Sequence, residues 1–165
     1  MEMNQKKILN VDQSYFLLWV TIMNQSQKSK IVIQNTLELM KRLKRVKNFT
    51  LLEIEKIFIE PNCLHRFPKK MSKNIHDSIW IINTFFHGDV RNVFVGNENE
   101  VFQNLIQFSG IGGHKAKIGA RIYSLYKQVR YGQRLISYAD LECSNIENTI
   151  MDELNILNVL ESDRV

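Results

Sequence analysis

The stretch Leu105-Ile106-Gln107-Phe108-Ser109-Gly110-Ile111-Gly112-Gly113-His114-Lys115-Ala116-Lys117 decides the fold of this chain. Ahead of the glycines, Val101, Leu105 and Phe108 recur at helical spacing. Asn97, followed three residues later by Glu100, has the pattern of a capping box that starts this helix. The sequence therefore predicts a helix that begins near residue 98 and ends just before the glycines.

A second helix is predicted over about residues 115–129, because its apolar residues fall on one stripe. The two helices are joined by Gly110-Ile111-Gly112-Gly113. Glycine permits a positive φ and leaves no side chain between backbone N–H groups and an incoming anion. The first N–H groups of a helix lack acceptors, so this point is a candidate anion site, with Ile111 directed into the core. The alternative is a glycine-rich turn that ends one helix and binds nothing.

Basic residues are concentrated around these glycines. Residues 101–139 contain no Asp or Glu and six basic residues, namely Lys115, Lys117, Arg121, Lys127, Arg130 and Arg134. The whole chain carries a formal net charge of +5, and residues 140–165 are acidic. Surplus Lys and Arg often cover an ordinary solvated surface, but a field of one sign beside exposed N–H groups is typical of nucleic-acid binding.

The glycine segment resembles the helix-hairpin-helix motif, in the form found in the endonuclease III-like DNA glycosylase superfamily. Three other segments resemble that family in the same order. Residues 15–26 look like its early buried helix with a Gln-containing turn, residues 70–75 like the basic start of a middle helix, and residues 87–90 like its Gly-acid-Val element. The resemblance spans about residues 12–160. It implies an all-α helical bundle whose helix-hairpin-helix element lies at about residues 98–130.

The resemblance implies base excision from DNA. Glycosylases of this superfamily cut the bond between base and sugar after flipping the nucleotide out of the stack. Bifunctional members use a lysine just after the hairpin glycines, where this chain has His114. Lys115, one residue on, is rotated by about 100° and does not replace it. A monofunctional enzyme is therefore implied, in which His114 contacts a phosphate or the flipped nucleotide; alternatively, His114 is an ordinary exposed residue in the first turn of a helix.

The second catalytic residue of the family is an aspartate after the second hairpin helix, which stabilises positive charge on the sugar or positions the nucleophile. Asp140 resembles it, although its distance along the chain from the hairpin is longer than usual. The alternative is that Asp140 only interacts with the dipole of the last helix, an effect of about 0.3–1 kcal/mol. Glu142 would serve as well.

The resemblance also assigns DNA contacts. Gln25 falls in the turn that fills the gap left by a flipped base or contacts the duplex, and it equally fits an ordinary polar turn. The expected DNA-binding residues are Gln25, Gly110, Gly112, Gly113, Lys115, Lys117 and Arg121. A second basic run over residues 41–47 is expected to be a solvated helix flank, with Glu38 and Arg42 as an i,i+4 pair.

The remaining sequence predicts further helices and a single domain over residues 1–165. The expected helix-starting caps are Asp12, Thr50, Ser72 and Ser144. Trp19 and Trp80 lie in apolar stripes and are expected in the core. An all-α architecture follows.

Cys63 and Cys143 show no metal-binding spacing, and two cysteines cannot supply the four-cysteine iron–sulfur cluster of many endonuclease III relatives. No metal held by side chains and no cofactor are therefore expected, and a monovalent cation bound by the backbone of the glycine segment, as in some members of the family that it resembles, is left open. No apolar run approaches the roughly 20 residues that cross a bilayer, so we expect a cytoplasmic protein with no membrane association, bound to the nucleoid when on DNA. Protein partners are left open.

Two functions are consistent with the sequence. The first is a monofunctional glycosylase that acts on a damaged or modified base in duplex DNA. The second is a catalytically inactive helix-hairpin-helix module that binds DNA or a partner protein. The glycosylase, and the inactive module if it binds DNA, should both have an affinity for DNA that falls as the salt concentration rises. They differ in base release: the glycosylase releases a base and Asp140→Asn should abolish that release, whereas the inactive module releases none.

Overall fold

The computed structural model describes residues 7–25, 28–131 and 145–162, and within these ranges it is all-α, as the sequence predicts. No described residue belongs to a β-strand. The elements are α1 (Val11–Met23), α2 (Ser29–Leu43), α3 (Leu51–Ile59), α4 (Pro68–Phe85), the 3-10 helix η1 (Val90–Val93), α5 (Glu98–Leu105), α6 (Gly113–Tyr131) and α7 (Asn145–Ser162). Residues 106–112, which join α5 to α6, are called the glycine loop below.

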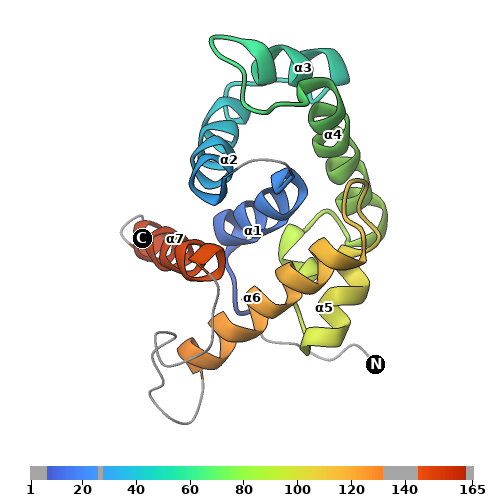
Figure 1. The fold of residues 1–165 in the computed structure, drawn as a ribbon. Helices are drawn as coiled ribbons and strands as arrows, with labels where there is room; N and C mark the ends of the chain where they lie inside the picture. The colour runs from blue at the N-terminus through green and yellow to red at the C-terminus, as the bar shows by residue number, and fades with distance from the viewer. Residues whose placement is uncertain (1–6, 26–27, 132–144, 163–165) are drawn as a thin grey trace.

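Helix α1 lies at the centre of the other helices (Figure 1) and contacts α2, α4, α6, α7 and η1. The sequence predicts one apolar face for this segment, but the structure buries it on nearly every side. Leu17, Leu18 and Ile22 are buried, and so are Phe16 and Val20. A helix that is apolar all round belongs in the core, and this composition is what places α1 there.

The start of α1 corrects one predicted cap. Asn10, and not Asp12, is the N-cap: its side chain accepts the Gln13 N–H at 2.8 Å, and the Gln13 side chain accepts the Asn10 N–H at 2.9 Å. Asp12 lies in the first turn, where a carboxylate favours the helix dipole. The buried Gln13 also donates to the Tyr126 hydroxyl and to the Leu154 carbonyl, so it ties α1 to α6 and α7.

The corner between α2 and α3 is held by Arg42. The predicted pair with Glu38 is present, with Nε and Oε2 2.9 Å apart. The expectation of a solvated flank is wrong for Arg42 itself, which is buried. Its guanidinium donates to the carbonyls of Ile57, Glu60 and Asn62, because the chain after α3 leaves these acceptors without a helical partner.

Two predictions about α4 are wrong, its N-cap Ser72 and the core position of Trp80. It begins at Pro68, a residue suited to the first helical turn, so Ser72 lies inside the helix and donates to the Lys69 carbonyl. Trp19 is 5% exposed, as predicted for a core residue, and its indole N–H donates to a serine of α4. Trp80 is 59% exposed, so its expected core position is wrong.

The predicted cap of α3 agrees with the structure. Thr50 caps α3 by accepting the Glu53 N–H at 3.2 Å. The chain leaves α4 before Gly88, whose φ is +73°. Ile150 and Leu154 are buried in α7, whereas its expected cap Ser144 lies outside the described residues.

Candidate nucleic-acid interface

Helices α5 and α6 pack closely and so fix the two ends of the glycine loop. α5 starts at the predicted capping box, in which Asn97 and Glu100 exchange hydrogen bonds of 2.9 and 3.2 Å. At the other helix, a Cβ built on Gly119 would come within 2.9 Å of Leu105 Cδ1 and 3.1 Å of Thr21 Oγ1. The absence of a side chain there lets α1, α5 and α6 meet.

Gly110 is the position in the glycine loop where glycine is required. Its φ is +85°, and a Cβ built on it would collide with the Asn74 side chain of α4. Gly112 and Gly113 have no positive φ, and apart from their chain neighbours and the backbone of α6 no described atom lies within 4 Å of a Cβ built on either. The predicted left-handed conformation is thus present at Gly110, while Gly112 and Gly113 leave the backbone open.

The inner side of the glycine loop is packed against α4 and the core. Ile111 is buried, as predicted. Phe108 stacks on Phe86, the residue that follows α4, with ring centroids 5.7 Å apart and ring planes 12° apart. These contacts hold the loop in place from within.

The outer side of the glycine loop presents the first turn of α6. The Gly112 carbonyl accepts the Ala116 N–H at 2.9 Å, which closes the first helical turn. The N–H groups of Gly113, His114 and Lys115 precede that bond and have no acceptor within the helix. Gly112, Gly113 and His114 are exposed. The positive end of the helix dipole therefore meets solvent beside bare backbone, an arrangement that suits an anion.

The Lys115 side chain turns inward from this turn. Its ammonium donates to the Ile22 carbonyl at 2.8 Å and to the Gly110 carbonyl at 3.1 Å. Burial, and then the positive charge of Lys70, lower the pKa of Lys115 to about 8. Lys115 thus ties the end of α1 to the glycine loop, a role that the sequence did not indicate.

The end of α1 has a second partner that sequence reasoning missed, His65. Its Nε2 lies 3.0 Å from the Met23 carbonyl oxygen, and its Nδ1 accepts the Phe67 N–H at 2.9 Å. These two contacts assign the proton to Nε2. Burial lowers the pKa of His65 and so favours the neutral ring. A single histidine in an irregular segment has no periodicity that would have revealed this contact.

The other basic residues of α6 point to different places. Lys117 is exposed. Arg121 Nε donates to Glu147 Oε2 at 2.8 Å and so links α6 to α7. Lys127 donates to the Gly96 carbonyl at 3.2 Å, at the approach to α5. Part of the positive charge counted in the sequence is therefore used in contacts within the fold.

The start of α4 brings further basic groups to the glycine loop. Lys70 and Lys73 are exposed, and Lys70 is near enough to Lys115 to lower its pKa. Asn74 is buried against Gly110, and among the described residues its amide nitrogen has no hydrogen-bond partner. The structure thus brings the segment 70–75 beside the glycine loop.

Two predicted site residues remain, Gln25 and Asp140, together with the alternative Glu142. Gln25 is partly buried just after α1, where its N–H donates to the Met23 carbonyl at 2.8 Å. Asp140 and Glu142 lie outside the described residues.

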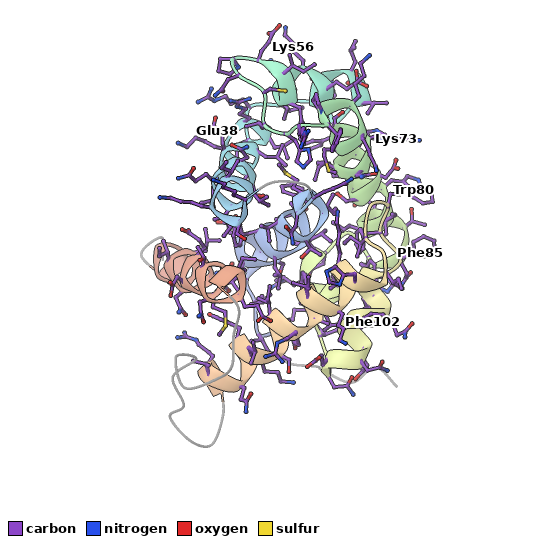
Figure 2. The ribbon with its side chains drawn as sticks, in the orientation of Figure 1. Glu38, Lys56, Lys73, Trp80, Phe85 and Phe102 are labelled. Carbon is purple, nitrogen blue, oxygen red and sulfur yellow. The ribbon has the colours of Figure 1, made fainter. Side chains whose placement is uncertain are left out.

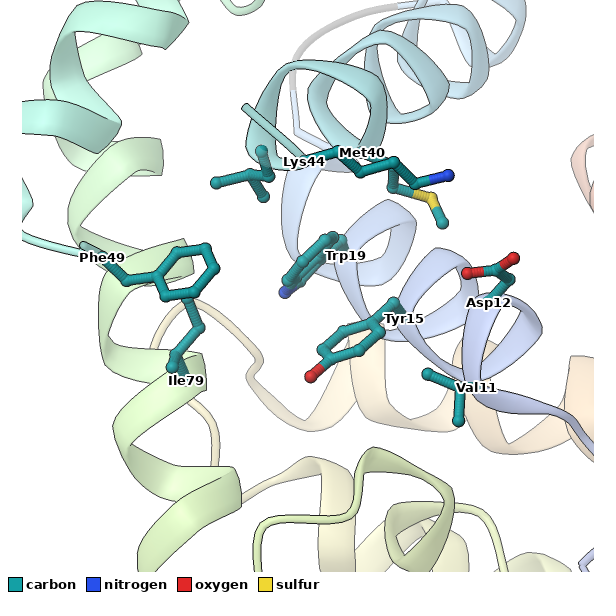
Figure 3. Close-up of a pocket in the computed structure, with 9 residues that line it drawn as sticks. Val11, Asp12, Tyr15, Trp19, Met40, Lys44, Phe49 and Ile79 are labelled. Atoms are coloured by element: carbon teal, nitrogen blue, oxygen red, sulfur yellow. The ribbon is translucent and has the colours of Figure 1, made fainter. Parts of the chain in front are cut away.

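An apolar pocket of about 240 Å³ lies apart from the glycine loop, between α1, α2 and α4. Figure 3 shows Phe49 facing Trp19 and Tyr15 across it, with Asp12 and Lys44 toward its edges. Of the predicted catalytic and DNA-binding residues that the structure describes, none lines this pocket.

Among the residues that the structure describes, no group of three or more His, Cys, Asp or Glu side chains is placed to hold a metal ion. No described helix has the length and apolar character needed to cross a bilayer. Comparison of the chain with protein-family models, curated proteins and solved structures finds no match.

Proposed function

We propose that this protein binds duplex DNA through the outer side of the glycine loop, in the manner of a helix-hairpin-helix protein of the DNA glycosylase type. The observation that carries this proposal is the open backbone at Gly112 and Gly113, directly at the start of α6. A phosphate at this point meets unpaired N–H groups and the positive end of the helix dipole. The exposed His114 and Lys117 flank it.

The chemistry that we propose is base excision by a monofunctional glycosylase acting on a damaged or modified base. Formation of a Schiff base requires a free amine at the reacting sugar. His114 has no amine, and the Lys115 ammonium is held by two backbone carbonyls. Asp140, which follows α6 in the chain, is the proposed catalytic carboxylate.

A second candidate is a catalytically inactive module of the same kind that binds DNA or a partner protein. One observation favours it: none of the proposed site residues that the structure describes lines the apolar pocket between α1, α2 and α4. Binding without chemistry needs only the outer side of the glycine loop.

DNA binding is tested by fluorescence anisotropy with a labelled duplex over a range of salt concentrations. The logarithm of the binding constant should fall linearly with the logarithm of salt concentration. Lys117→Glu should weaken binding and reduce the salt slope by about 1. Gly112→Asp should weaken it further, because it places a carboxylate at the proposed phosphate site.

The matched control is Lys56→Glu on α3, which lies far from the glycine loop (Figure 2). This variant should have little effect on DNA affinity. Unchanged affinity of Gly112→Asp would contradict the proposal.

Base excision is tested with a panel of duplexes that each contain one damaged, deaminated or mismatched base. Strand scission that requires hot alkali would identify a monofunctional glycosylase and its substrate. Asp140→Asn should then abolish base release while leaving DNA affinity nearly intact. If no duplex yields product while salt-sensitive binding persists, the inactive module is the correct function.

A further inference from the structure

The outward face of α4 carries a stripe that is basic at one end and aromatic at the other. Lys69, Lys73 and Trp80 follow one another at intervals of four and seven residues, which places them on one helix face. From Lys69 to Trp80 the helix rises by about 16 Å. Figure 2 shows Lys73, Trp80 and Phe85 in succession along the outer edge of α4.

The aromatic end of the stripe is exposed. Trp80 is 59% and Phe85 57% exposed, and their rings meet edge to face with centroids 6.0 Å apart. Two large aromatic side chains left together at the surface are typical of a binding site. The ring planes stand at 85° to each other, so the two rings are not stacked face to face, and more than half of Trp80 remains exposed.

This stripe lies beside the glycine loop. The loop contacts α4 at two points, where Gly110 packs on Asn74 and where Phe108 stacks on Phe86. Trp80 lies between these two points along α4. The loop and the stripe therefore share one stretch of α4.

The charges near the stripe favour a polyanion as the occupant. Lys69, Lys70 and Lys73 are exposed on the first turns of α4. From Lys69 to Trp80 the helix carries one carboxylate, Asp77, against these three lysines, so the net charge of this part of α4 is positive. A stripe that combines ammonium groups with an open aromatic ring suits single-stranded nucleic acid, in which phosphates and unpaired bases alternate.

We infer that Trp80, supported by Phe85, stacks on unpaired bases of a single-stranded segment that continues from the duplex held at the glycine loop. This inference rests on the proposed function and specifies its substrate class as DNA with a duplex-to-single-strand junction. Lys69 and Lys73 contact the phosphates of the same strand. Stacking is independent of base identity because every base has a π-face.

The test compares a blunt duplex with the same duplex carrying a single-stranded overhang of about ten nucleotides, a length within the range that such sites cover. The wild-type protein should bind the overhang probe about tenfold more tightly than the blunt probe, and Trp80→Ala should abolish that difference. Trp80→Phe should retain much of it. The control Leu52→Ala removes another exposed apolar side chain, on α3, and should retain all of it.

Tryptophan emission gives an independent readout, because the chain has only two tryptophans. The overhang should quench emission of the exposed Trp80, while the buried Trp19 remains as a constant background.

A wild-type protein that binds both probes equally, or a Trp80→Ala variant that keeps the preference, would overturn the inference and leave duplex binding intact. Failure to bind either probe would overturn both proposals. Overhang binding that depends on Trp80 but not on Gly112 or Lys117 would support stacking and contradict duplex binding by the loop.

Discussion

The two sides of the glycine loop differ in what their residues do, although they are only a few positions apart in sequence. On the inner side, Phe108 and Ile111 are buried and Gly110 packs on Asn74. On the outer side, Gly112 and His114 are exposed. Within one short segment, some residues thus pack the loop against α4 and the core, while their neighbours leave its backbone exposed to solvent. Substitutions on the inner side should change stability, and substitutions on the outer side should change binding.

Phe108→Ala should have the largest effect on stability, a loss of about 3–5 kcal/mol, because it removes a buried aromatic ring and leaves a cavity beside Phe86. Urea unfolding followed by circular dichroism measures this loss. The matched control is Phe85→Ala, which removes an exposed ring of the same size and should change the free energy of unfolding by about 0.5 kcal/mol or less. Equal losses for the two variants would show that the inner side is not a packed surface.

Gly110→Ala should cause the second-largest loss of stability. A positive φ costs an L-residue about 1–2 kcal/mol, and the added Cβ also meets the Asn74 side chain. The Asn74→Ala substitution removes the side chain that the added Cβ meets. Gly110→Ala should therefore lower the free energy of unfolding less in an Asn74→Ala background than in the wild type. Gly112→Ala, where the backbone is open, is the control. A loss as large as that of Gly110→Ala would contradict the described division of the loop.

Lys115→Met should destabilise the fold by about 1 kcal/mol near neutral pH, because two carbonyls lose a donor. The pH dependence gives a sharper test. The pKa of Lys115 is lowered to about 8 in the folded protein from 10.5. Between these values the unfolded chain binds more protons, so stability rises with pH there. The advantage of the wild type over Lys115→Met in unfolding free energy should therefore grow from pH 8 to pH 10.5. A constant difference would place the ammonium in solvent.

His114→Ala and Lys117→Ala on the outer side should have the smallest effect on stability, within about 0.5 kcal/mol. Their effect should be on DNA affinity instead, with the larger loss for Lys117→Ala since it removes a full charge. Thermal unfolding and anisotropy on the same samples separate the two quantities. A stability loss without a change in affinity would reverse the assignment of the outer side.

The apolar periodicity of the sequence is sufficient to predict the helices, but the candidate capping residues do not identify the first residue of every helix. Asn97 and Thr50 cap the helices they were predicted to cap, because each precedes its apolar run by the expected interval. Asp12 and Ser72 do not, since Asn10 and Pro68 begin those helices earlier and a capping side chain works only at the boundary itself. Periodicity finds a helix more reliably than its first residue.

Burial depends on neighbours that periodicity cannot identify. Trp19 and Trp80 both lie in apolar stretches, yet only Trp19 is buried, because α1 is central and α4 is peripheral. Arg42 was expected in solvent and is buried because three carbonyls near the end of α3 converge on it.

The candidate site was predictable as a segment but not in its internal division. The positions of Ile111 and of a positive-φ glycine were anticipated. The inward turn of Lys115 and the contact of His65 with α1 were not, because both depend on where the carbonyls of α1 lie in space. A count of charges along a sequence does not show which ammonium groups are committed to the fold.

The bond from Lys115 to the Ile22 carbonyl has a further consequence, for the rate and entropy of binding. It joins the start of α6 to the most buried helix of the protein, so the first turn of α6 is held before any ligand arrives. An anion that binds there meets donors already in position, and little ordering entropy is lost on association. Association with the outer side of the loop should therefore be governed by diffusion and electrostatic attraction, without a slow folding step.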